Sequence, residues 1–179
     1  MIRHEGDPGR CAVVLPGIRY FSQAPLLWFA REAAQARGWS VVEVDERAPA
    51  GEEPFRWMRE RAKRALDSAS AAERKVVIGK SLGSVAATLV SCPAVWLTPL
   101  LTEREIADAL AATTAPTLLV GSPADPTWGH GAVPDNEALE VMELDGLDHS
   151  LQVSGDPRAS LDALGRVTAR VDAFLAALL

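Results

Sequence analysis

The chain has 179 residues, of which 48 % are hydrophobic and 23 % charged, and its formal net charge is −6. This length and composition predict one soluble globular domain with a sizeable core. They argue against a nucleic-acid-binding surface, because no basic cluster with interleaved aromatic side chains is present.

The sequence also favours a protein that works without a membrane or a cofactor. No apolar run is long enough to span a bilayer, and residues 1–10 are polar rather than leader-like. Cys11 and Cys92 form no disulfide framework, and we expect both in or near the core. His, Cys and Asp are not grouped at ligand spacing, so no metal is expected. A cytoplasmic location is the default expectation.

Apolar runs that are typical of buried strands alternate with amphipathic helical segments along the chain. The predicted strands cover residues 11–15, 39–44, 75–78, 94–97, 116–121 and 139–144. The predicted helices cover residues 25–37, 54–69 and 84–90, a segment that begins near 102, and the end of the chain from about 160.

This alternation predicts an α/β protein, a three-layer α/β/α sandwich around a mainly parallel sheet of about six strands. We expect a single domain over residues 11–179, preceded by a polar segment over residues 1–10. In such a sheet, ligands bind beyond the carboxyl ends of the strands.

The most informative motif is Gly79-Lys80-Ser81-Leu82-Gly83, which follows the third predicted strand and precedes a helix. G-x-S-x-G in this context predicts a nucleophile elbow, with a strained, exposed Ser81 and a Leu82 amide free to donate to an oxyanion. Two other interpretations stay open, an ordinary glycine-containing turn and a phosphate-binding P-loop. The P-loop requires a glycine where Arg74 stands. Lys80 is expected to face solvent.

Two further residues complete a predicted catalytic set. Asp125 follows the fifth predicted strand and His149 follows the sixth. Serine needs a neutral imidazole to take its proton, and the imidazole needs a carboxylate to fix its tautomer. We therefore predict Ser81 as nucleophile, His149 as base and Asp125 as orienting acid. The alternatives are Asp145 or Asp148 as the acid and His130 as the base, while His4 lies in a polar tail.

With its elbow and its order Ser, Asp, His, the chain resembles the α/β-hydrolase family over residues 11–179, in particular small cap-less bacterial members close to dienelactone hydrolases. The resemblance implies a second oxyanion donor in the loop after the first predicted strand, either Gly17 or Ile18. It also implies that the family's first two strands are missing and that the cap is reduced. Tyr20 and Trp128 are candidate pocket walls, with ordinary packing an equally good interpretation.

The leading functional hypothesis is a serine hydrolase that cleaves a small-molecule carboxylic ester or thioester through an acyl-enzyme on Ser81. One alternative is a non-catalytic binding or scaffolding protein on a hydrolase fold. Another is an acyltransferase that uses the same three residues. The sequence leaves open whether the protein is a monomer or a homodimer.

Overall fold

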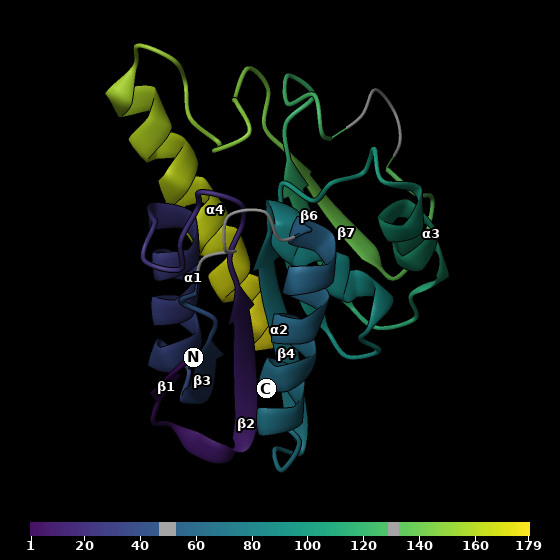
Figure 1. The fold of residues 1–179 in the computed structure, drawn as a ribbon. Coiled ribbons are helices and arrows are strands. Elements are labelled where there is room, and N and C mark those ends of the chain that lie inside the picture. The colour runs from purple at the N-terminus through teal and green to yellow at the C-terminus, as the bar shows by residue number, and fades with distance from the viewer. Residues whose placement is uncertain (47–52, 129–132) are drawn as a thin grey trace.

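The computed structural model describes residues 1–46, 53–128 and 133–179, and it places one seven-stranded sheet between two layers of helices (Figure 1). The strand order is β1-β3-β2-β4-β5-β6-β7. Only β1 pairs antiparallel, and the other pairs are parallel. The strands are β1 (Ile2–His4), β2 (Asp7–Leu15), β3 (Trp39–Glu43), β4 (Arg74–Lys80), β5 (Ala94–Leu97), β6 (Thr117–Gly121) and β7 (Leu139–Glu143).

The helices divide between the two faces of the sheet. On one face α1 (Pro25–Ala36) packs beside α4 (Pro157–Ala177). On the other face α2 (Pro54–Ser68) and α3 (Arg104–Ala112) pack around the short 3₁₀ helix η1 (Ser81–Thr88). The three-layer α/β/α architecture predicted from the alternating pattern is therefore confirmed.

Each face of the sheet has its own hydrophobic core, and strand alternation assigns residues to one or the other. In β2, Ala12 and Val14 join the core under α1 and α4, whereas Val13 and Leu15 join the core under α2, η1 and α3. All four side chains are fully buried. Because both faces are covered, the central strands are continuous apolar runs, which is why they could be recognised in the sequence.

The structure differs from the sequence prediction in the region before Cys11. Residues 2–4 form an additional edge strand, and β2 begins at Asp7, so the sheet has seven strands instead of about six. These residues are mostly exposed, and an edge strand with one solvated side accepts polar side chains. The apolar pattern therefore gave no signal for them.

Two helix boundaries also differ from expectation. The helix after the elbow is a 3₁₀ helix that starts at Ser81 itself, whereas the periodicity predicted residues 84–90. The last helix starts at Pro157 rather than near residue 160. Asp156 caps it by accepting hydrogen bonds from the amides of Arg158 and Ala159, and proline suits the first helical position.

The topology brings two loops together at one point of the sheet. From β2 the chain crosses to β3 on one side and later returns to β4 on the other side. The ends of β2 and β4 lie next to each other, with Leu15 paired to Gly79. At such a switch point the loops diverge and leave a crevice, and here they are the loop after Leu15 and the elbow at Ser81.

Candidate active site

Ser81 stands at a sharp, strained corner between β4 and η1. Its φ angle is 52°, a left-handed conformation that a non-glycine residue adopts only where its surroundings enforce it. The two glycines of the motif allow the close packing around it. A Cβ atom on Gly79 would lie 2.6 Å from the Trp96 ring, and one on Gly83 would lie 2.7 Å from the Leu15 carbonyl oxygen. The motif therefore forms the strand–turn–helix elbow that the sequence predicts.

The three residues singled out in the sequence lie in one hydrogen-bonded chain. His149 Nε2 is 2.8 Å from Ser81 Oγ, and His149 Nδ1 is 2.7 Å from Asp125 Oδ2. The residues come from three loops, those that follow β4, β6 and β7, which open at the same edge of the sheet. The Asp125 carboxylate is buried, whereas the His149 side chain is 35 % exposed and can be reached from solvent.

Thr127 is a fourth member of this cluster, and the sequence analysis missed it. Its backbone amide and its hydroxyl both donate to Asp125 Oδ1, each at 2.9 Å. The same hydroxyl lies 2.9 Å from His149 Nδ1. Burial raises the pKa of the Asp125 carboxyl, but the hydrogen bonds from His149 and Thr127 outweigh burial and hold that pKa below its usual value. The sequence signal for this contact was Asp125-Pro126-Thr127 at a turn, because an aspartate side chain often accepts a hydrogen bond from the backbone amide two residues later.

The rival residues occupy other places. The Asp148 side chain accepts from the amides of Ser150 and Gln152, so it shapes the turn that carries His149 rather than bonding to the ring. Asp145 is exposed. His4 lies beside Glu43, near the edge of the sheet. His130 falls outside the described residues.

The loop after β2 lies against Ser81. A Cβ atom on Gly17 would lie 3.2 Å from Ser81 Cβ, so the loop packs tightly against the elbow. The Gly17 amide already donates to the Tyr20 carbonyl at 3.0 Å, whereas among the described residues the Ile18 amide has no hydrogen-bond partner. Leu82 is the second residue of η1, where helical amides lack an intrahelical acceptor. The roles of Ile18 and Leu82 as oxyanion donors stay a prediction.

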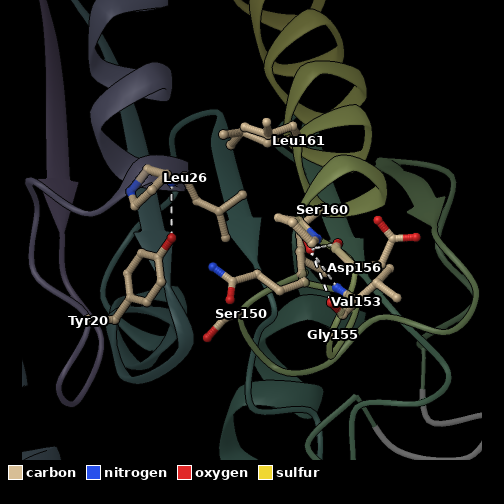
Figure 2. Close-up of a pocket in the computed structure, with 13 residues that line it drawn as sticks. Tyr20, Leu26, Ser150, Val153, Gly155, Asp156, Ser160 and Leu161 are labelled. Carbon is tan, nitrogen blue, oxygen red and sulfur yellow. Dashed lines mark hydrogen bonds between the residues drawn. The ribbon is translucent and has the colours of Figure 1, made fainter.

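Several contacts hold this loop in place. Ser22 donates to Asp45 at 2.9 Å, and Gln23 donates to the buried Glu43 at 2.7 Å. The Tyr20 hydroxyl accepts from the amide of Leu26 in the first turn of α1 (Figure 2). The loop is thereby fixed to β3, to the segment that follows it and to α1, which preorganises the Ile18 amide.

The expectation that Lys80 faces solvent is wrong, because this residue is only 2 % exposed. Its Nζ donates to the His149 carbonyl at 2.9 Å and lies 4.9 Å from the centroid of the Tyr20 ring. Burial lowers the pKa of Lys80 to about 8, against the opposing attraction of Asp125 and Asp148. The extended β4 strand carries this side chain inward, beneath the loops of the site.

Trp128 does not wall an open pocket, as the sequence analysis considered. It is 1 % exposed, and its Nε1 donates to Glu143 at 2.8 Å. A Cβ atom on Gly121 would lie 1.8 Å from its ring, so the indole fills the space that this glycine leaves. The alternative interpretation of ordinary packing is the correct one for Trp128.

Tyr20 does line a cavity, which has a volume of about 490 Å³ and lies between the start of α1, the segment that follows His149 and the start of α4 (Figure 2). Its wall is largely apolar. It includes Leu26, Leu151, Val153 and Leu161, with Ser150 and Gln152 among the polar residues. A smaller cavity of about 260 Å³ is bordered by Ile18 and Leu82, on the other side of the β2 loop.

Within residues 1–46, 53–128 and 133–179, no group of three or more His, Cys, Asp and Glu side chains is arranged to hold a metal ion. In the same parts of the chain, no helix is long and apolar enough to cross a membrane.

No protein-family model matches the chain, and no curated protein matches it. Solved structures match it over nearly its whole length. Est1E from Butyrivibrio proteoclasticus, in its complex with ferulic acid, is 14 % identical with a TM-score of 0.71, over 99 % of this chain and 94 % of that one. The Pyrococcus furiosus esterase Pf2001 is also 14 % identical, with a TM-score of 0.69, over 99 % and 91 %.

A third similar structure is XC6422 from Xanthomonas campestris, described as an α/β serine hydrolase without lid. It is 14 % identical with a TM-score of 0.62, over 96 % of this chain and 87 % of that one. These similarities show that the chain has the α/β-hydrolase fold, as the resemblance noted in the sequence predicts. At this level of identity they carry the fold and not the activity.

Proposed function

We propose that the protein is a serine hydrolase that cleaves a carboxylic ester or thioester, with Ser81 as nucleophile, His149 as base and Asp125 as orienting acid. The observation that carries this proposal is the continuous hydrogen-bonded chain from Ser81 through His149 to Asp125, with Ser81 in a strained conformation. Neither feature is needed to build the sheet, and together they are what acyl transfer to serine requires.

The protonation states follow from the partners. Asp125 is ionised at neutral pH because its hydrogen bonds hold its pKa low, and an ionised carboxylate can only accept. The proton of the neutral imidazole therefore sits on Nδ1, where it points to Asp125. Nε2 is left with a lone pair for the Ser81 proton. In this assignment Thr127 donates to the other carboxylate oxygen and restrains the aspartate.

The reaction then proceeds in two halves. Ser81 Oγ bonds to the substrate carbonyl carbon while its proton passes to His149 Nε2, and the amides of Leu82 and Ile18 donate to the oxyanion. The bond to the alcohol or thiol breaks, and Nε2 returns the proton to the leaving group. Water repeats the sequence, with His149 as base, and releases the acid from Ser81.

The two cavities support a proposal for how the substrate is oriented. The leaving group must depart next to Nε2, and the larger apolar cavity of about 490 Å³ is bordered by the residues that directly follow His149. The acyl group lies on the oxyanion side, where the cavity beside Ile18 and Leu82 has about 260 Å³. We expect short acyl chains and larger apolar alcohol or thiol groups to be favoured, and a panel of esters and thioesters that varies each side independently measures this.

The direct test is labelling with a fluorophosphonate, read by intact mass. Ser81 Oγ would bond to phosphorus and displace fluoride. We expect one adduct on the wild type and on Ser154→Ala, a control at an exposed serine in the loop after His149, and none on Ser81→Ala. The absence of an adduct on folded wild type would refute the proposal and favour a non-catalytic binding protein.

Acyl transfer to an acceptor other than water is the second candidate, since the open cavities could admit an alcohol or amine. Product analysis with an added alcohol or amine separates the two activities. Free acid should dominate if the protein is a hydrolase, and a new ester or amide should dominate if it is a transferase.

A further inference from the structure

Lys80 occupies the position directly before Ser81, and its burial requires an explanation. A lysine is almost never fully buried unless its charge is compensated. Within the described residues no carboxylate forms an ion pair with Lys80. Its three N–H donors face one carbonyl oxygen, that of His149, and the face of the Tyr20 ring. An apolar side chain would cost the fold less, which points to a role at the site.

The contacts of Lys80 join the three segments that make up the site. Lys80 itself belongs to the elbow, and its hydrogen bond holds the main chain of His149, which lies on a loop between β7 and α4. Tyr20 covers the ammonium from the loop that carries Ile18. In the same loop, a Cβ atom on Gly17 would lie 3.2 Å from Lys80 Cδ, so the packing is close on that side as well.

The Lys80 ammonium also lies in the field of two carboxylates, Asp125 from the loop after β6 and Asp148 from the loop after β7. Neither carboxylate forms an ion pair with it among the described residues. The hydrogen bond to the His149 main-chain carbonyl is therefore the direct polar contact that ties this side chain to the site.

We propose that Lys80 is a positioning residue of this site: its ammonium fixes the His149 main chain against the elbow. This inference rests on the proposed serine hydrolase function. It assigns a task to the variable position that precedes the serine in G-x-S-x-G.

The test compares Lys80→Met with Lys75→Met. Methionine has a similar length but neither charge nor an N–H donor. Lys75 is a matched control, because it lies in the same strand and its Nζ also donates to a backbone carbonyl, that of Ala72, at 3.2 Å. For each protein, kcat and KM for a p-nitrophenyl ester and the rate of fluorophosphonate labelling are measured between pH 5 and pH 8.

We expect Lys80→Met to lower kcat roughly ten- to hundredfold with little change in KM, because a small displacement of the base is costly. The rate of fluorophosphonate labelling should fall with kcat, because both reactions need the base in place. Lys75→Met should match the wild type in kcat, KM and labelling rate.

Lys80→Gln provides a second measurement and carries the test if Lys80→Met does not fold. Glutamine keeps an N–H donor for the His149 carbonyl, so it should lose less kcat than Lys80→Met, again with little change in KM. A lowered kcat with an unchanged KM in Lys80→Gln supports the proposal. Variants with wild-type kcat would overturn it while wild-type labelling still upheld the hydrolase. A wild type that is not labelled would refute the hydrolase itself.

Discussion

Replacing Lys80 with methionine should stabilise the folded protein at neutral pH, although it should impair the site. Burial lowers the pKa of Lys80 from 10.5 to about 8. Each pKa unit corresponds to about 1.4 kcal/mol, so keeping this lysine charged in the folded protein costs about 3 kcal/mol at pH 7. The side chain is 2 % exposed, so little of this cost is relieved by solvent. Methionine avoids the cost but loses the hydrogen bond to His149, worth about 1 kcal/mol.

The stability difference between Lys80→Met and the wild type should become smaller as the pH rises. Between about pH 8 and pH 10.5, the unfolded chain keeps its proton on Lys80 while the folded protein loses it. The unfolded state then binds more protons, so the free energy of unfolding of the wild type rises with pH. Below pH 8 both states are protonated and the cost is constant. The advantage of Lys80→Met, about 2 kcal/mol at pH 7, should therefore shrink by about 2 kcal/mol or more by pH 10.

Urea unfolding of both proteins at a series of pH values from 6 to 10 measures this difference. Burial raises the pKa values of Cys11, Cys92 and Tyr20, which lowers the stability of both proteins at high pH. For the two cysteines this contribution cancels in the comparison. Burial raises the pKa of Tyr20 to about 12, so the series ends at pH 10, before the tyrosine contribution becomes large. Two stability curves that stay parallel from pH 7 to pH 10 would refute the reasoning.

Three further predictions concern the site and its support. Asp125→Asn should fold normally, and its kcat should fall roughly a thousandfold or more, because an amide no longer fixes the tautomer of His149. Circular dichroism checks the fold, and ester hydrolysis measures kcat. Thr127→Val should lower kcat roughly tenfold and Thr127→Ser should retain it, since the hydroxyl is the side-chain group of Thr127 that reaches Asp125 and His149; equal rates for the two variants would contradict this. Gly121→Ala should lower stability by about 3 kcal/mol or more, because its Cβ would overlap the Trp128 ring, and a thermal melt within a few degrees of wild type would exclude the overlap.

Local patterns in the chain were enough to predict the layers of the fold and three residues of the candidate site. The strands around Val13, Ile78 and Leu119 are contiguous apolar runs because helices cover both faces of the sheet. The elbow at Ser81 is contained in five consecutive residues because its geometry is local. Asp125 and His149 could be located because each lies in the loop that follows a strand.

The features that the sequence did not predict depend on backbone and side-chain contacts, some of them between distant segments and some within one turn. The edge strand at Ile2–His4 exists only because β3 is there to pair with it. Trp128 is buried because Gly121, seven positions earlier by their numbering, leaves space for its ring. The choice between Gly17 and Ile18 depends on a turn that uses the Gly17 amide. None of these outcomes can be read from the residue types alone.

What the sequence determined by itself is therefore the order of the elements from β2 onward, the strained corner at Ser81 and the chain positions of its two partners, since these follow from local backbone geometry and from burial patterns. The tertiary structure decided which groups meet. It joined Thr127 to Asp125 and His149, and it carried Lys80 inward to the carbonyl of a residue far along the chain. The physical reason is that a hydrogen bond tolerates a change of only a few tenths of an ångström in its donor–acceptor distance. Only the packing of loops from several strands fixes that distance.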